Sequence, residues 1–240
     1  MLQSIKQLYG SRLGAADGEI GEVKDFYFDD QNWAIRYVIA ETGNWLNGRQ
    51  VLISPHAFSR LTPVEKVWAV KLTRKQIEDS PAIETHRPVS RQYEMDYHRY
   101  YGWPFYWEGD GLWGGTRGFP VLDVPVNHLP GELAKEIGAQ AERADAHLRS
   151  TQSVSGYHLQ ATDGIIGHVG DYLVNPRSWA IEQLIVKTGH RFSGKDVLVP
   201  RSEVSRISYE DSTVFVKSTR EAVEKSPAYH LVPALPAITL

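Results

Sequence analysis

The sequence predicts a mainly β protein that contains two copies of one small barrel. The segment WAIRYVIAETG begins at Trp33, and WAIEQLIVKTG begins at Trp179, 146 residues later. The same offset relates residues 2–82 to residues 148–228 without a gap, and 28 of the 73 pairs from position 10 onward are identical. Because chance does not produce this agreement, the sequence indicates a tandem duplication.

Each copy has the pattern of short strands separated by turns. In the first copy, strands are expected at 11–15, 20–28, 33–41, 50–54, 58–62 and 67–72. Asp17-Gly18 is typical of a tight hairpin turn. Alternating apolar residues in strands this short favour a small barrel or closed sheet. Thr73 and Thr219 are expected to N-cap a short helix at the end of each copy.

The duplication predicts four segments along the chain. They are a first barrel at 1–83, a linker at 84–147, a second barrel at 148–230 and a tail at 231–240. The linker is expected to hold an aromatic loop and then one α-helix at about 130–148, because apolar residues recur there at helical spacing.

Seven of the eleven residues in YHRYYGWPFYW, at 97–107, are aromatic. The candidate interface residues of the linker are Tyr100, Trp103, Phe105, Tyr106, Trp107 and Trp113. They are interpreted as packing that joins the barrels, as a stacking platform for sugar rings or single-stranded nucleic acid, or as a surface for a protein partner. Nucleic-acid platforms usually interleave several basic residues, and this run holds only Arg99, so packing is favoured.

Large apolar residues also stand at the tips of two equivalent loops. These are Trp45 in the first copy and Phe192 in the second. An exposed apolar tip is typical of a partner contact, but it also suits packing against the linker. Packing is the favoured interpretation.

Composition excludes several classes of function. The net charge of −3 argues against direct nucleic-acid binding, and the absence of cysteine excludes disulfides and thiolate chemistry. No window of the sequence is apolar enough to span a membrane, and the N-terminus lacks a signal-peptide pattern. We expect a soluble protein of a bacterial cytoplasm. Phosphate-binding, zinc-protease and serine-hydrolase motifs are absent.

Candidate chemistry is sparse. Asp25 and its equivalent Asp171 could act as an acid or base, but no shared histidine, lysine or second carboxylate accompanies them, so a structural role is favoured. Across the predicted hairpin, the first copy pairs Arg12 with Glu22, an ion pair.

The second copy places His158 opposite His168 at that same hairpin position. This pair could begin a zinc or nickel site with His190 as third ligand, or it could be an exposed, pH-sensitive pair without a ligand.

The order DGEIGEVKDFYFDD, then WAIRYVIAETG, then GRQVLISP resembles the PRC-barrel family. That small β-barrel forms the cytoplasmic part of the photosynthetic reaction-centre H subunit and the C-terminal half of the ribosome-maturation protein RimM. The resemblance covers both copies. It implies a binding or scaffolding module and not an enzyme. The membrane helix of the H subunit and the N-terminal domain of RimM have no counterpart here, so neither specific role is carried over.

The expected function is therefore a non-enzymatic scaffold of two PRC barrels, without a cofactor, that binds one or more proteins. Self-association into a homo-oligomer is a further option. One alternative is a small-ligand or metal-binding protein that uses His158, His168 and the linker aromatics. Another is a ribosome-assembly accessory by analogy with RimM.

Overall fold

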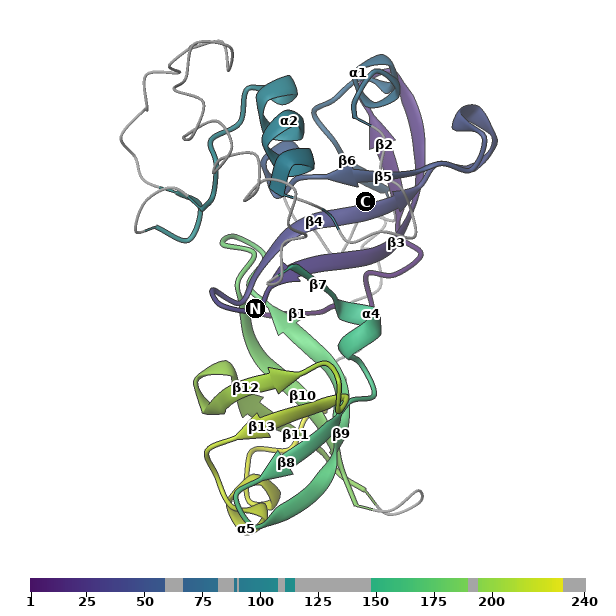
Figure 1. Ribbon diagram of the computed structural model, residues 1–240. Helices are drawn as coiled ribbons and strands as arrows, with labels where there is room; N and C mark the ends of the chain where they lie inside the picture. Colours follow the sequence, from purple (N-terminus) through teal and green to yellow (C-terminus); the bar gives the residue numbers. More distant parts are fainter. Residues whose placement is uncertain are drawn as a thin grey trace, which may run out of the picture. The chain divides into compact units, whose positions relative to one another are not determined.

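The computed structural model describes residues 1–58, 67–81, 89, 91–107, 111–114, 148–189 and 194–230. The chain divides into two compact units (Figure 1). One unit combines Met1–Arg74 with Arg149–Leu240, so it contains both repeats, and the other is Lys75–Leu148. Most of the predicted linker, its helix at about 130–148 and the tail at 231–240 lie outside the described residues, so these predicted boundaries stay predictions.

The first sheet is formed by the first repeat. Its strands are β2 (Arg12–Ala15), β3 (Gly18–Asp29), β4 (Ala34–Glu41), β5 (Gln50–Ile53) and β6 (Val67–Ala69), in the order β5-β4-β3-β2-β6. In this order, β2 and β6 pair in parallel and the other neighbouring strands pair antiparallel. Two short 3-10 helices, η1 (Gly43–Leu46) and η2 (Pro55–Ala57), flank β5, and α1 (Arg74–Glu78) follows β6.

The second sheet repeats this arrangement. Its strands are β8 (His158–Ala161), β9 (Gly164–Val174), β10 (Ile181–Thr188), β11 (Asp196–Pro200), β12 (Val204–Ser208) and β13 (Thr213–Val216), in the order β11-β10-β9-β8-β13-β12. The helix α5 (Arg220–Glu224) is N-capped by Thr219, as predicted. The prediction of a mainly β protein is confirmed.

The prediction of closed sheets is not borne out. Within the described residues, the first and last strands of each sheet do not pair with one another, so neither sheet closes on itself. In the second sheet, β11 leads through the 3-10 helix η4 (Arg201–Glu203) into β12. The two edge strands therefore follow one another around a corner and do not pair side by side.

The two repeats exchange their first strands. β1 (Gln3–Ser4) of the first repeat pairs with β9, and β7 (Leu148–Ser150) of the second pairs with β3. A short helix, α4 (Thr151–Val154), follows β7. Each sheet is thus completed by a strand from the other repeat, and this arrangement is reciprocal.

The two equivalent tryptophans lie where the repeats meet. Trp33 and Trp179 have φ angles of 54° and 60°, in the left-handed region that bulky residues rarely adopt. The Ile35 N–H donates to the Trp179 carbonyl at 2.9 Å, and the Ile181 N–H donates to the Trp33 carbonyl at 2.7 Å. We infer that these reciprocal bonds and the burial of both indoles offset a strain of about 1–2 kcal/mol per residue.

Apolar packing continues across this junction. The Phe28 and Tyr172 rings lie 5.9 Å apart, and the Phe58 and Trp179 rings lie 5.3 Å apart. Phe28 and Tyr172 are fully buried. The repeats therefore share one continuous core. Among the described residues, no helix is long and apolar enough to cross a membrane.

Gly21 is required by close packing of β3 against β4. A Cβ at this position would lie 1.9 Å from the Glu41 carbonyl oxygen, and φ is +146°. Gly21→Ala should therefore lower the free energy of unfolding by about 3 kcal/mol or more. Gly43→Ala is the matched control, because its φ is +60° but no atom lies within 4 Å of the added carbon. The control should lose only about 1 kcal/mol in urea denaturation; equal losses would contradict this explanation.

Candidate functional site

A pocket of about 960 Å³ opens on the second sheet. We call it the second-repeat pocket, and its titratable lining residues are His158, His168, Lys187, Asp196, Arg220 and Glu224. It contains the two histidines that the sequence places opposite one another. Residues 190–193, which include the predicted ligand His190 and the predicted contact Phe192, lie outside the described residues.

The strand register places four of these side chains in one row across the sheet. His158 on β8 is opposite His168 on β9, as the hairpin turn predicts. His168 is in turn opposite Lys187 on β10, and Lys187 is opposite Asp196 on β11. Directly opposite residues on neighbouring strands hold their Cβ atoms about 4.5–5.5 Å apart, so the row forms one surface.

Gly167 lets β9 and β10 approach closely beside this row. A Cβ on Gly167 would lie 2.0 Å from the Lys187 carbonyl oxygen. Its equivalent in the first repeat is Gly21, which meets the Glu41 carbonyl in the same way. The repeats therefore share the backbone geometry under the row, and they differ in the side chains that it carries.

Further lining comes from α5 and from residues of β9 and the end of β10, among them an exposed aliphatic residue. The Arg220 N–H donates to the Asp163 carboxylate at 2.8 Å, which fixes the start of α5 against the β8–β9 turn. The Arg220 guanidinium lies 3.8 Å from that carboxylate. Ile165 is 57% exposed and lines the pocket. The pocket thus combines basic, acidic and apolar groups.

In the first repeat, Trp45 occupies the corresponding place. Its indole N–H donates to the Ile20 carbonyl at 2.5 Å, and the Arg74 guanidinium lies over its ring at 4.3 Å. The equivalents of Ile20 and Arg74 are Ile166 and Arg220, and both line the second-repeat pocket. Trp45 therefore packs within its own repeat. The favoured interpretation, packing against the linker, and the alternative of a partner contact both stay predictions.

The charge of the row also differs between the repeats. The first repeat has Arg12, Glu22, Glu41 and Gln50 in the equivalent register. The predicted ion pair between Arg12 and Glu22 is wrong, because Arg12 pairs with Glu19, with N···O at 2.5 Å. A bulge after Leu13 shifts the register and brings Glu19 to the same face as Arg12.

The described residues contain no group of three or more histidines or acids placed to hold a metal ion. His158 and His168 alone would supply two ligands, and a structural zinc site uses four. Lys187 is a cation beside the pair. The metal hypothesis, which also needs His190, stays a prediction.

Asp25 and Asp171 hold the exchanged segments. Asp25 accepts hydrogen bonds from the Ser150 and Thr151 hydroxyls and the Gln152 N–H of the second repeat. Asp171 accepts from the Ser4 hydroxyl and, at 3.0 Å, the Lys6 N–H of the first. The shared aspartates therefore join the repeats.

Burial sets the protonation of these two aspartates. It raises the pKa of Asp25 and of Asp171 above the usual value, and the hydrogen bonds from the other repeat oppose this shift. Their carboxylates are occupied by structural donors. The structural role favoured from sequence fits this geometry.

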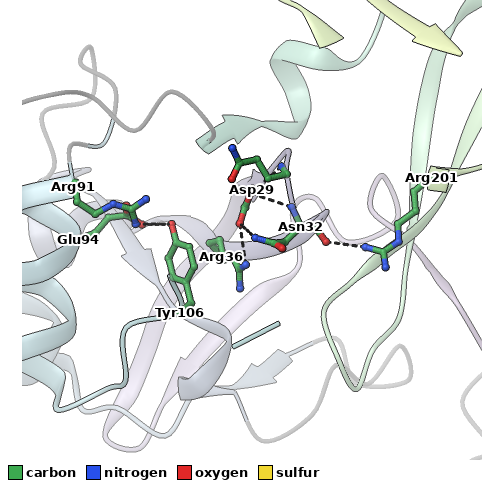
Figure 2. A network of polar contacts seen from close by, with 8 residues as sticks. Asp29, Asn32, Arg36, Arg91, Glu94, Tyr106 and Arg201 are labelled. Atoms are coloured by element: carbon green, nitrogen blue, oxygen red, sulfur yellow. Dashed lines mark hydrogen bonds and ion pairs between the residues drawn. The ribbon is translucent and has the colours of Figure 1, made fainter. Parts of the chain in front are cut away.

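A buried ion pair stabilises the turn after β3 (Figure 2). The Arg36 guanidinium is fully buried and lies 2.9 Å from the Asp29 carboxylate, which also accepts from the Asn32 side chain. The Asn32 carbonyl accepts from Arg201 of the second repeat at 2.7 Å. This network is a further polar link between the repeats, and the sequence pattern did not predict it.

The unit Lys75–Leu148 contains all the aromatic residues of the linker. The predicted aromatic loop is in part a helix, α2 (Arg91–Tyr101), which is followed by Gly102 with φ of +68°. Glycine with positive φ is the usual residue after a helix, and Pro104 prevents its continuation.

The aromatic rings of this unit pack on one another around His98, which is 1% exposed. The Tyr101 and Trp103 rings stack at 4.4 Å, and the Phe105 and Trp107 rings stack at 4.9 Å. Tyr100 is 42% exposed, Tyr106 is buried, and Trp113 is half-buried. Whether these residues hold the barrels together or bind a partner stays a prediction.

A buried carboxylate anchors the same cluster. Glu94 is fully buried, accepts from the Tyr106 hydroxyl at 2.7 Å and lies 3.1 Å from the Arg91 guanidinium. Figure 2 draws these three side chains. The Arg91 guanidinium also lies 4.1 Å from the centre of the Trp107 ring. Arg91 therefore lies close to both the Glu94 carboxylate and the ring of Trp107.

Comparison with known proteins identifies the class of the first repeat. Residues 5–77 match the model of the PRC-barrel domain. The chain thus carries a PRC-barrel domain that spans β2 to β6 and continues into α1. No curated protein matches the chain.

Replacing Asp25 tests how strongly the repeats are joined. Asp25→Ala leaves two hydroxyls and one N–H of the second repeat without their acceptor, so unfolding should become easier by about 2–4 kcal/mol. Asp17→Ala is the control, because exposed Asp17 caps only the Arg74 N–H of its own repeat. Asp17→Ala should lower the free energy of unfolding by about 1 kcal/mol. If urea denaturation shows a smaller decrease for Asp25→Ala than for Asp17→Ala, the proposed link between the repeats is refuted.

His56 makes stability depend on pH. Burial, and next the charge of Arg36, lower the pKa of His56 below the usual 6.5. The unfolded chain therefore binds a proton more readily than the folded chain, and this residue reduces stability as the pH falls below about 6.5. Between pH 7.5 and pH 5.5, the free energy of unfolding should fall less for the His56→Gln variant than for the natural protein. Identical slopes in parallel urea titrations would show that His56 does not contribute.

Proposed function

We propose that the chain is a non-enzymatic interaction module of two PRC-type barrels, the second formed by β8–β13. The PRC-barrel match of the first repeat, the 146-residue offset and the equivalent strand order of the second sheet support this proposal. A bacterial cytoplasm is the proposed location.

The residues that both repeats retain are used to build the module. Asp25 and Asp171 bind the exchanged segments, and Trp33 and Trp179 supply the carbonyls that join the repeats. A catalytic group would need a carboxylate or histidine available to a substrate in a positioned set. The shared aspartates are occupied instead by protein donors, which supports a scaffold over an enzyme.

One observation carries the proposal to a particular surface. The second-repeat pocket is lined by His158, His168 and Lys187, where the first repeat has Arg12, Glu22 and Glu41 in the same register. Two copies of one module have thus diverged in side chains over a shared backbone. We infer that the first repeat supports the structure and that the second repeat binds the partner.

Ligand binding is the second candidate function, because the pocket contains the predicted pair His158 and His168. The ribosome-assembly alternative has no observation in its favour among the described residues.

Capture of partners by the full-length chain tests this proposal. Ile165→Asp places a charge on an exposed pocket residue and should reduce recovery of a stoichiometric partner at least tenfold, because an apolar contact is replaced by a charge that must be desolvated. Val67→Asp is the control, since Val67 is 38% exposed on β6 of the first repeat. Quantitative mass spectrometry should find unchanged capture with Val67→Asp. Equal capture by both variants, or no partner at all, would contradict the proposal.

A further inference from the structure

We propose that the second-repeat pocket binds an oxyanion, a carboxylate or phosphate group, through His158, His168 and Lys187. We take the oxyanion to belong to an acidic segment of the protein partner, and this part of the inference rests on the proposed function. The row of cross-strand neighbours presents two imidazoles and one ammonium side by side. Both kinds of side chain donate hydrogen bonds to oxyanions once protonated.

The fixed charge beside the two histidines argues against a cation. Lys187 lies directly opposite His168, so a divalent cation between the histidines would lie close to the Lys187 ammonium. The equivalent row of the first repeat carries Glu22 and Glu41 where the second repeat has His168 and Lys187, so two carboxylates are replaced by two possible hydrogen-bond donors.

Three acids also lie at or beside the pocket. Asp196 lies opposite Lys187, and Glu224 enters from α5. The Asp163 carboxylate lies 3.8 Å from the Arg220 guanidinium. An oxyanion would therefore be held by the hydrogen-bond donors of the row itself and not by a net positive charge of the pocket.

The size and the apolar part of the pocket indicate a ligand larger than a bare ion. A volume of about 960 Å³ exceeds the need of a single phosphate or carboxylate group. Ile165 is 57% exposed within the same lining. A glutamate or aspartate side chain on an extended peptide would place its carboxylate on the row and its methylene groups on Ile165.

The test is an NMR titration of the protein at pH 7, in which the histidine signals are followed as ligand is added. Sulfate is the first probe, and a tetraglutamate peptide is the second. Sodium chloride at matched ionic strength is the control salt. The imidazole signals of His158 and His168 are assigned from His158→Gln and His168→Gln. Both signals should shift saturably with sulfate and with the peptide, and sodium chloride should not reproduce the shifts.

Two lysine variants separate a specific site from general attraction. Lys187→Gln should weaken binding of both probes roughly five- to tenfold, whereas Lys195→Gln removes an exposed lysine that does not line the pocket and should change it less than twofold. Equal effects of the two variants, or no shift beyond that of chloride, would overturn the proposal. Tight Zn²⁺ binding to the histidines without a response to sulfate would also overturn it.

The titration and the capture experiment fail independently. An oxyanion site without any captured protein would retain the pocket chemistry and reject the scaffold function. If a partner is captured equally well by Lys187→Gln and the histidine signals do not shift with either probe, the oxyanion site is rejected and the scaffold function is retained.

Discussion

The reciprocal exchange of first strands is the interaction on which the rest of the structure depends. β1 completes the second sheet and β7 completes the first, and a buried aspartate at each junction receives the incoming segment. Neither repeat has its full set of hydrogen bonds without the other. The left-handed conformations of Trp33 and Trp179 fit this arrangement, because each tryptophan carbonyl accepts an N–H from the other repeat.

A joined pair of this kind lets its two members diverge. Three equivalent pairs at the junction are identical in the two repeats: Ser4 and Ser150, Asp25 and Asp171, and Trp33 and Trp179. A change at one of these positions would weaken the hydrogen bonds between the repeats. The row across β8 to β11 lies outside the junction and differs between the repeats: His168 and Lys187 stand where the first repeat has Glu22 and Glu41. In the first repeat, Trp45 packs beside the equivalent row and donates to the Ile20 carbonyl. The proposed function accordingly assigns stability to the junction and recognition to the row.

Sequence reasoning predicted most of the described strands and the hairpin register, because the ungapped offset and the Asp-Gly turns constrain both. It missed β1, and the strand expected at 58–62 lies mostly outside the described residues.

The same hairpin turn correctly placed His158 opposite His168 and Arg12 opposite Glu22. The ion pair of Arg12 was wrong because a bulge next to Gly21 brings Glu19 to the same face of the sheet, and Glu19 takes the contact. A glycine within a strand is a known sign of a bulge, so Gly21 was a usable signal. Lys187 could have been found by extending the register one strand further along the row.

The strand exchange could not be predicted from sequence patterns. Ser4 and Asp171 are 167 residues apart, and their pairing leaves no periodic signal. The identity of Ser4 with Ser150 and of Asp25 with Asp171 was a usable clue, since both pairs keep a hydroxyl and a carboxylate. The helical form of residues 91–101 was also missed, because glycine and proline after Tyr101 made the whole aromatic run resemble a loop.

Native-state hydrogen exchange tests the central claim most directly. The amides of Ile5, Ile35 and Ile181 each donate to a carbonyl of the other repeat, to Tyr172, Trp179 and Trp33 respectively. If the exchange joins the repeats into one cooperative structure, these three amides should open with the same free energy as the central amides of β3 and β9. Opening of Ile5 at a free energy several kcal/mol lower, with the sheets still protected, would show that the exchanged strand is dispensable and would contradict the account.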